Sequence, residues 1–327
     1  ADVVAPSPLV VAMADQHRRT VMVARTNSQD ALPTTWGLQV STYATELARH
    51  LHRLHQLRDR ACMGMFGGAV GTLASSDGQG RAVRDHMLRS LGLSSAPGAW
   101  NGSQDGITEV LLWTGLVHGT LGRIANDVEM QGRTSVGELA EGEGGGGSST
   151  MPHKGNPRAC NAIQGFTRVG TTLAGGAYAL MDQVDVRAAS MRAVSWTLVP
   201  EAMLGLSASL DRARGLVEHL VVDADAMRAN FAHSRNFVMS ESVMMHLAQI
   251  IGREPAYSLV KRALAAHDDG RSSLATVLSR SEAVTEHMGP DALARACDPT
   301  AYLGETDALI DEALAAARDA LALPELA

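Results

Sequence analysis

Large aromatic side chains and cysteines are both scarce in this sequence of 327 residues. Phe, Trp and Tyr make up 4% of it, so the hydrophobic core must be built mainly from Ala, Leu, Val and Met. Small and straight-chain residues of this kind favour close-packed helices over sheets. The three cysteines, Cys62, Cys160 and Cys297, lie far apart and show no paired spacing. We therefore expect neither a disulfide framework nor a zinc site, and the expected location is a reducing cytoplasm.

A large excess of one charge and long apolar runs are also missing. The formal net charge is −7, with 19% charged and 45% hydrophobic residues. This composition excludes a disordered chain and argues against a nucleic-acid partner. No uncharged apolar run reaches the roughly 18 residues of a membrane span, and the first residues lack the basic region of a signal peptide. We expect a globular chain of about two domains with no membrane partner.

Apolar residues recur at intervals of three and four along most of the chain, which is typical of amphipathic helices. The helical patterns cover residues 38–57, 110–130, 159–181, 198–221, 223–231, 240–251 and 254–266. A polar stretch interrupts them at 182–195, and residues 21–24 favour an extended segment. The sequence therefore predicts an all-α fold, with a bundle of long helices over residues 1–220 and a small helical C-terminal domain over residues 221–327.

The densest functional signal is the segment GGGGSSTMPHKGNP at residues 144–157. Its glycine run lets the backbone approach a ligand closely. Ser148 offers a hydroxyl, and Lys154 supplies a positive charge. Asn156 and Pro157 are typical of the N-cap and first position of a helix, whose N-terminus attracts anions. The segment thus predicts an anion-binding site, while a glycine linker beside a capped helix is the alternative. The pattern of a phosphate loop is absent.

The run GSSTMPHKGN at residues 147–156 resembles, without a gap, the Gly-Ser-Ser-x-Met-Pro-x-Lys-x-Asn signature of the fumarase/aspartase superfamily. A second block, RTNSQDALPTTWG at 25–37, is similar to the superfamily's Arg-Thr-His-x-Gln segment and the Pro-x-Thr-x-Gly that follows it. Further similarity runs through residues 66–75, the loop at Trp100 and DPTAYLG at 298–304. Together the blocks look most like the 3-carboxy-cis,cis-muconate cycloisomerase branch, over almost the whole chain.

This resemblance implies a reaction and the residues that perform it. Members abstract a proton next to a carboxylate and expel a β-substituent, usually leaving fumarate, whereas the cycloisomerase branch closes a lactone. Ser148 would be the general base, helped by backbone N–H groups and Lys154. Lys154, Asn156 and Arg187 would hold a substrate carboxylate. The other substrate-binding positions that the resemblance implies are Thr26, Asn27, Gln29, Ser149 and Met151.

The resemblance also implies an assembly. Members form a homotetramer through their long helices, and each active site takes its three blocks from three subunits. They act on small dicarboxylates, and no cofactor is implied. Members usually have three domains, and this chain begins just before the second block. The resemblance therefore implies that an N-terminal domain is absent from this sequence.

Several ionisable groups of the cycloisomerases are missing from the matching positions. Asn27 stands where the second block often has His, and WNGSQ at 100–104 replaces Trp-His-Thr-x-Arg. RAVSW at 192–196 replaces Trp-His-Ala-Glu-Trp. Asn cannot deliver a proton at neutral pH, and a shortage of cations disfavours a tricarboxylate. Nitrite departs as a stable anion without an acid, so we expect a nitrosuccinate lyase that releases nitrite and fumarate.

Two alternatives stay open at this point. Some cycloisomerases also lack the His of the second block, so a lactonising 3-carboxy-cis,cis-muconate cycloisomerase is the first. A non-catalytic structural relative is the second, because lens crystallins reuse this fold. The intact Ser148, Lys154 and Asn156 argue against the structural relative.

Other ionisable residues have simpler explanations. His52 and His55 are three residues apart, but no carboxylate completes a metal-binding set, so we expect no metal. Glu138, Glu141 and Glu143 precede or enter the glycine-rich segment, and we expect them to form the solvated edge of a mobile loop.

Overall fold

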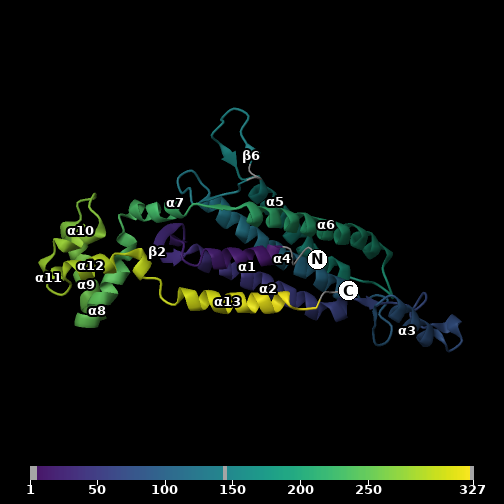
Figure 1. Cartoon of the computed structure of the whole chain (residues 1–327). Helices are drawn as coiled ribbons and strands as arrows, with labels where there is room; N and C mark the ends of the chain where they lie inside the picture. Colours follow the sequence, from purple (N-terminus) through teal and green to yellow (C-terminus); the bar gives the residue numbers. More distant parts are fainter. Residues whose placement is uncertain (1–5, 143–145, 325–327) are drawn as a thin grey trace.

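The computed structural model describes residues 6–142 and 146–324 as an elongated helical bundle with a group of shorter helices at one end (Figure 1). The helices are α1 (Pro6–Gln16), α2 (Trp36–Ala61), α3 (Gly80–Ser90), α4 (Asp105–Gln131), α5 (Arg158–Gly176), α6 (Ala189–His219), α7 (Ala224–Ala229), α8 (Ser240–Ile251), α9 (Arg253–His267), α10 (Leu274–Ser279), α11 (Glu282–Thr285), α12 (Pro290–Ala296) and α13 (Thr306–Leu321). Short 3₁₀ turns are η1 (Ala74–Ser76), η2 (Ala177–Met181), η3 (Asn230–Ser234), η4 (Phe237–Met239) and η5 (Pro299–Ala301). The all-α prediction is confirmed.

The main core lies between α1, α2, α4, α5, α6 and α13. Its buried side chains are mostly Leu, Val, Ala and Ile, with few rings, as the composition predicts. The helix α2 begins at Trp36 because the Thr35 side chain accepts a hydrogen bond from the Leu38 N–H at 3.1 Å, which satisfies one free donor of the first turn. None of the helices described in residues 6–142 and 146–324 is long and apolar enough to cross a bilayer.

Glycines allow the helices of this core to approach closely. A Cβ added to Gly37 would lie 2.5 Å from the Ala14 carbonyl oxygen, where α1 meets α2. A Cβ on Gly170 of α5 would lie 2.2 Å from the ring of His118 in α4. Contacts this short are unavailable to any larger residue. The glycines are therefore required for the spacing of the bundle.

A second core joins helices α8 to α12. It is separate from the main one, and the chain reaches it after α7 and leaves it before α13, which returns to pack along α2 (Figure 1). Where the chain leaves this group, the Tyr302 hydroxyl donates to the carboxylate of Glu241, at the start of α8, at 3.1 Å. The division at residue 220 stays a prediction, and α13, from beyond that boundary, contributes Ile310 and Leu314 to the main core.

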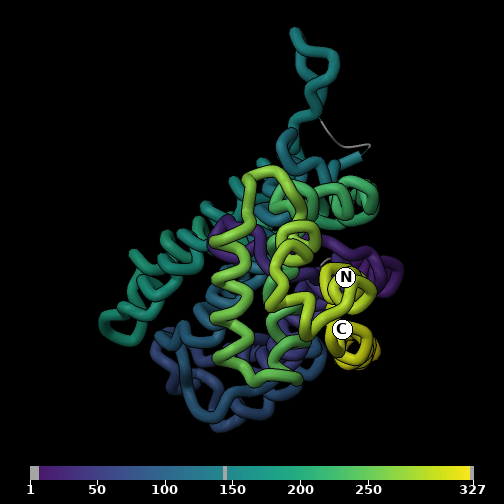
Figure 2. The backbone as a smooth tube through the Cα atoms, turned by 90° about the vertical axis from the view of Figure 1, so that its left-hand side faces the viewer, coloured from purple at the N-terminus to yellow at the C-terminus, as the bar shows by residue number. Residues whose placement is uncertain are grey.

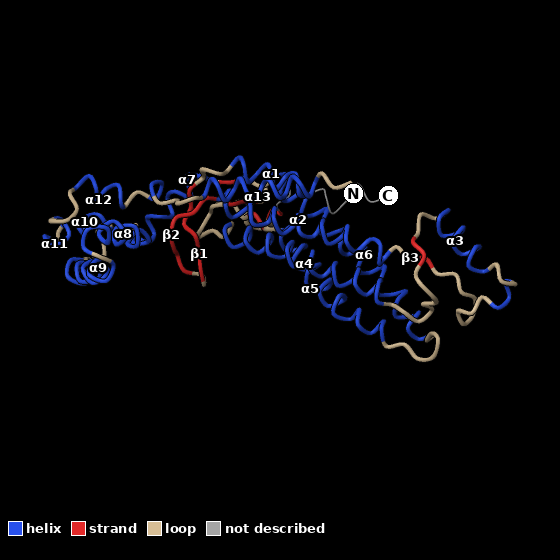
Figure 3. The backbone as a smooth tube through the Cα atoms, turned by 90° about the horizontal axis from the view of Figure 1, so that it is seen from below, coloured by secondary structure: helices blue, strands red, loops and turns tan. Residues whose placement is uncertain are grey.

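The strands form short two-stranded sheets in the segments that connect the helices (Figure 3). They are the antiparallel pairs β1 (Val21–Thr26) with β2 (Gln29–Thr35), β5 (Leu139–Ala140) with β8 (Val221–Val222), and β6 (Gly146–Gly147) with β7 (Gly155–Asn156), and the parallel pair β3 (Met63–Gly64) with β4 (Ser94–Ser95). The extended segment predicted at 21–24 is part of β1, but β2 was not predicted. The prediction that 182–195 is not helical was wrong from Ala189, where α6 begins.

Two histidines are buried between the long helices. The His50 side chain contacts the Thr120 hydroxyl at 2.9 Å, and burial and nearby Arg53 lower the pKa of His50 to about 4. Neither ring nitrogen of His118 has a hydrogen-bond partner within residues 6–142 and 146–324, and burial lowers the pKa of His118 as well. Both imidazoles are therefore neutral in the folded protein at neutral pH.

Acidification is expected to destabilise the fold through these imidazoles. The unfolded chain binds a proton at His50 below a pKa of 6.5, whereas the folded chain does so only near 4. Stability conferred by neutral His50 is thus complete above 6.5 and is lost as the pH falls from 6.5 to about 4, by roughly 3 kcal/mol. Urea denaturation at about pH 7 and about pH 4 measures this loss. His50→Gln, which keeps a partner for Thr120, should lose less, and an identical loss in both proteins would contradict the assignment.

Candidate active site

The signature segment forms a hairpin that projects from the bundle (Figures 1 and 2). Strands β6 and β7 pair at its base, and the turn between them carries Ser148, Ser149, Met151 and Lys154. The Ser148 Oγ accepts hydrogen bonds from the N–H groups of Thr150 at 3.3 Å and Met151 at 3.0 Å. Donors in this position are those that stabilise an alkoxide. The same contacts also occur in an ordinary serine turn.

The surroundings of Ser148 are open in this single chain. Ser148 is half-buried, and Ser149, Met151 and Lys154 are exposed. The main-chain N–H of Lys154 donates to the Met151 carbonyl at 3.0 Å, while its side chain extends to solvent. The hairpin therefore presents a serine and a lysine on one exposed turn without covering them.

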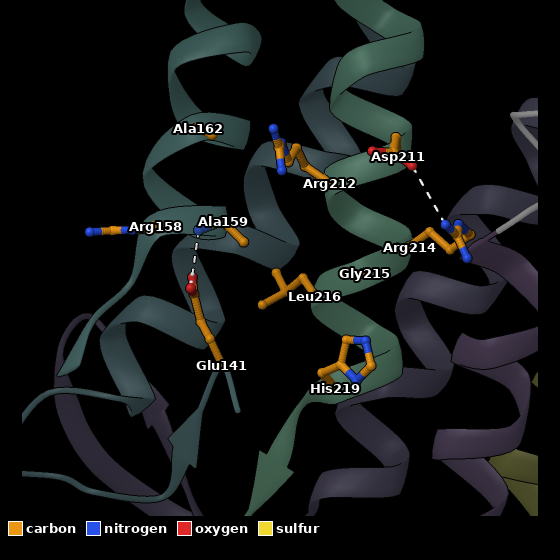
Figure 4. A pocket seen from close by; sticks show the side chains of 10 residues that line it. All are labelled: Glu141, Arg158, Ala159, Ala162, Asp211, Arg212, Arg214, Gly215, Leu216 and His219. Carbon is orange, nitrogen blue, oxygen red and sulfur yellow. Dashed lines mark hydrogen bonds and ion pairs between the residues drawn. The ribbon is translucent and has the colours of Figure 1, made fainter. Parts of the chain in front are cut away.

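The root of the hairpin is held by Glu141. Its carboxylate accepts from the N–H of Ala159 at 3.0 Å, as Figure 4 shows, and from the N–H of Cys160 at 2.8 Å, both in the first turn of α5. This contact adds a negative charge to the positive end of the helix. Burial raises the pKa of the Cys160 thiol, and the Glu141 carboxylate beside the thiol adds to this rise. The segment before the glycine run is thus tied to the segment that follows the signature.

Two predictions about this region were wrong. α5 begins at Arg158, and no side chain of Asn156 or Pro157 caps it, because Glu141 reaches the free N–H groups from another segment. Glu138 and Glu141 are not a solvated edge, since their exposed fractions are 0% and 7%. Glu143 lies outside the described residues.

Hairpin β1–β2 carries the second predicted block at its tip. Thr26 pairs with Gln29, and Asn27 and Ser28 form the two-residue turn with φ of 51° and 62°. A turn with positive φ at both positions favours Asn, and His also tolerates this conformation. Thr26, Asn27 and Gln29 are all exposed. Asn27 therefore has a conformational reason to be there in addition to any contact with substrate.

Arg187 belongs to the segment that joins η2 to α6. This segment lies at the end of the bundle near α3 (Figures 1 and 3). Its side chain is exposed. The loop at Trp100 lies against the same segment, because a Cβ on Gly102 would be 2.7 Å from the Val186 carbonyl oxygen. The Trp100 indole N–H in turn donates to Gly64 at 3.3 Å. The fold thus brings the loop at Trp100 next to the segment that contains Arg187.

The structure therefore keeps the predicted site residues in three places. The tip of hairpin β1–β2 lies towards the α8–α12 end, the segment containing Arg187 lies at the opposite end, and the signature hairpin projects between them (Figure 1). One chain alone does not surround a substrate with all three.

Cavities next to the signature hairpin involve few of the predicted residues. A cavity of about 500 Å³ between α5 and α6 is lined by Glu141, Arg158, Arg212 and His219, among others (Figure 4). None of the predicted site residues lines it. A smaller cavity of about 160 Å³ includes Asn156 and also borders Glu141. In the described part of the chain, no group of three or more His, Cys, Asp or Glu side chains is placed to hold a metal.

Sequence reasoning missed two residues that fix these blocks, Glu138 and Asn230. Glu138 binds Arg25 of β1, and Asn230 of η3 donates to Glu138. The signal available in the sequence was the position of Arg25 beside the second block, since an arginine at a half-buried strand needs an acidic partner. Its partner, 113 residues away, could not be identified from spacing.

The chain matches known families over both of its parts. Residues 9–169 match a family described as "Lyase", and residues 236–313 match "Adenylosuccinate lyase C-terminus". A 3-carboxy-cis,cis-muconate cycloisomerase of Bradyrhizobium diazoefficiens is 37% identical over 93% of this chain and 68% of the relative. The chain belongs to the fumarase/aspartase superfamily. The resemblance drawn from residues 25–37 and 147–156 is thereby confirmed.

Other members of this superfamily are similar over the same extent. An N-acetyl-S-(2-succino)cysteine lyase of Dickeya dadantii is 34% identical over 92% of this chain and 67% of the relative. The solved 3-carboxy-cis,cis-muconate lactonizing enzyme from Pseudomonas putida superposes with a TM-score of 0.92 at 29% identity, covering 98% of this chain and 72% of that one. The fumarate lyase from Mesorhizobium sp. BNC1 superposes with a TM-score of 0.89 at 30% identity, covering 96% and 71%. The chain is thus a superfamily lyase that spans about two thirds of its relatives.

Proposed function

We propose that this lyase removes a proton next to a carboxylate of a succinate-type substrate and expels a β-substituent to give fumarate. The observation that carries the proposal is Ser148 on the signature hairpin, with two backbone N–H groups directed at its Oγ. Those donors and the nearby Lys154 favour the alkoxide that a serine base requires. Lys154, Asn156 and Arg187 are cationic or amide groups suited to a carboxylate.

Nitrosuccinate is the specific substrate that we propose. The Ser148 alkoxide takes the proton from the carbon next to one carboxylate. The electron pair of that C–H bond forms the double bond, and the C–N bond breaks with its electrons on nitrite. Nitrite needs no proton, which fits Asn27 at the hairpin tip and Asn101 and Gly102 in the loop at Trp100, because an amide is not an acid and glycine has no side chain. The products are fumarate and nitrite.

A lactonising cycloisomerase is the second candidate function. The cycloisomerase of Bradyrhizobium diazoefficiens supports it at 37% identity, and it fits the comparisons equally well. Its substrate carries three carboxylates, for which the loops around Trp100 and Arg187 offer few cations. We favour the dicarboxylate for that reason.

A substrate panel separates the two functions. The purified protein is incubated with nitrosuccinate, 3-carboxy-cis,cis-muconate, aspartate or argininosuccinate, and nitrite, fumarate and lactone are measured. We expect nitrite and fumarate in equal amounts from nitrosuccinate alone. Turnover of the muconate without release of nitrite would replace the proposal with the cycloisomerase function. Asn27→His, which suits the same turn, should not increase nitrite release, because this leaving group needs no acid.

We also propose that the active protein is a homotetramer in the cytoplasm whose sites combine blocks from different subunits. The separation of the predicted site residues into three places along one chain supports the shared sites (Figure 1). The exposed apolar side chains of α5 and α6, including Val169 and Leu204, support helix-to-helix association. The three unpaired cysteines are compatible with a reducing compartment.

A further inference from the structure

The carboxylate of Glu138 is fully buried and uses both oxygens. Its Oε2 accepts from Arg25 Nη1 at 2.6 Å, and its Oε1 accepts from Arg25 Nη2 at 2.7 Å. Asn230 Nδ2 also donates to Oε1 at 2.6 Å. The exposed fraction of the Glu138 side chain is 0%, and that of Arg25 is 25%. This two-armed geometry fixes the orientation of the Arg25 guanidinium as well as its distance from the Glu138 carboxylate.

The main chain of Glu138 joins further elements at the same point. Its N–H donates to the Gln131 carbonyl at the end of α4, and its carbonyl accepts from the Asp223 N–H before α7, both at 2.9 Å. Asn230 also donates to the Val136 carbonyl at 2.9 Å. Glu138 therefore connects hairpin β1–β2 to the ends of α4 and α7 and to η3.

A short strand links this point to the root of the signature hairpin. Strand β5 lies between Glu138 and Glu141, pairs with β8 and buries Leu139 in the main core. At its far end Glu141 holds the first turn of α5, which follows the signature. One fixed segment of four residues, 138–141, thus holds the hairpin carrying Thr26 at one end and the signature hairpin at the other.

Stability alone is a weak reason for such a buried pair. Burying two charges costs solvation energy that their attraction often only offsets, so an apolar replacement is frequently as stable. What an apolar pair cannot supply is the fixed orientation of Arg25. Arg25 directly precedes Thr26, so its guanidinium sets the position of the strand end that carries the predicted substrate contacts.

We infer that Glu138 is a positioning residue for the elimination reaction: through Arg25 and Asn230 it orients the tip of hairpin β1–β2 towards the substrate. It touches no substrate itself. Glu141 is its counterpart for the signature hairpin. The inference rests on the proposed function, because it takes Thr26, Asn27 and Gln29 as substrate contacts and Ser148 as the base.

The test compares Glu138→Gln with two variants. Glutamine keeps the size of the side chain but replaces one carboxylate oxygen by a donor, so one arm of Arg25 loses its acceptor. We expect KM for the substrate that the wild type converts best to rise about tenfold, with a smaller change in kcat, since the tip binds but does not react. Glu141→Gln should instead lower kcat more than it raises KM, because it loosens the hairpin of Ser148. Arg25→Lys should resemble Glu138→Gln, since lysine lacks the second arm.

Glu109→Gln is the matched control. Glu109 also accepts two hydrogen bonds from one arginine, from Nη2 of Arg60 at 2.6 Å and from Nε at 2.9 Å, but on the exposed surface between α2 and α4. We expect no change in KM or kcat for this variant. Equal KM values for Glu138→Gln and Glu109→Gln would overturn the inference. If Glu138→Gln does not fold, Arg25→Lys, which leaves Glu138 paired with a cation, decides in the same way.

A measurement without substrate separates this inference from the proposed function. Hydrogen exchange of the main-chain amides at residues 21–35 should be faster in Glu138→Gln than in the wild type, while amides of the α8–α12 group keep their rates. Unchanged exchange in the hairpin would overturn the inference whatever the substrate is. Faster exchange together with a wild type that converts no compound of the panel would overturn the proposed function and leave the orientation of the hairpin by Glu138 established.

Discussion

Ser148→Ala is expected to lower kcat for elimination by about a thousandfold, which lies within the range for loss of a positioned general base. Alanine has no group that can accept the substrate proton, and Thr150 and Met151 then direct their N–H groups at an empty position. The melting temperature should stay at the wild-type value, because among the described residues the Ser148 Oγ hydrogen-bonds with N–H groups of its own turn. Release of nitrite or fumarate under saturating substrate measures kcat, and circular dichroism measures the melting temperature.

Ser149→Ala is the control for this experiment. Ser149 is the neighbouring exposed hydroxyl of the same turn, so its removal tests whether any serine in the hairpin suffices. Because Ser149 is an expected substrate contact and not the base, we expect Ser149→Ala to raise KM while its kcat stays close to that of the wild type. A Ser148→Ala protein with full activity, or a greater loss in Ser149→Ala, would refute Ser148 as the base.

Mixing two inactive variants is expected to restore activity. Ser148→Ala removes the base, and Arg187→Ala removes a cation at the far end of the same chain. If a site takes its signature hairpin and its Arg187 from different subunits, random tetramers contain about a quarter of sites with both residues intact. The proteins are unfolded together, refolded and assayed for fumarate. Each variant alone should stay inactive under the same treatment.

The alternative arrangement gives a different result. If the hairpin and Arg187 of one chain met in one site, every site in the mixture would lack one of them, and the mixture would be no more active than the sum of its parts. Refolding each variant with wild-type chains provides the second control. It shows that mixed tetramers form and that the mutant chains do not inhibit the intact sites in them.

The long helices were predictable because their pattern is local. Periodicity at residues 38–57 and 110–130 falls within α2 and α4, and the structure extends each pattern only at its ends. Hairpin β1–β2 was predicted only in part, because β2 contains Pro33 and too few alternating apolar residues for the pattern to be visible. The start of α6 was missed as well, because its first turn reads Ala-Ser-Met-Arg and its two apolar residues, Ala189 and Met191, are two positions apart, which is not a helical spacing.

Some residues of the site could also be predicted from the local sequence, and others could not. Ser148 and Lys154 could be named from the sequence, since the signature is contiguous and its resemblance is specific. The buried roles of Glu138 and Glu141 could not, because an acidic side chain is usually exposed. Each becomes buried only when a distant segment supplies donors, as Arg25 does for Glu138. Which donors such a carboxylate finds is decided by the fold and cannot be predicted from the residues next to it in the sequence.

The return of α13 to α2 has a consequence for how the chain folds. The two helices pack together although most of the sequence separates them, and closing so long a loop is entropically slow. The α8–α12 group has its own core and local contacts, so it can form early. Once Tyr302 hydrogen-bonds to Glu241, the beginning and the end of the α8–α12 group are held together. The loop that closes when α13 packs on α2 is then shorter by the length of that group. We therefore expect the α8–α12 group to fold before α13 packs on α2, and to lower the entropic cost of that last step.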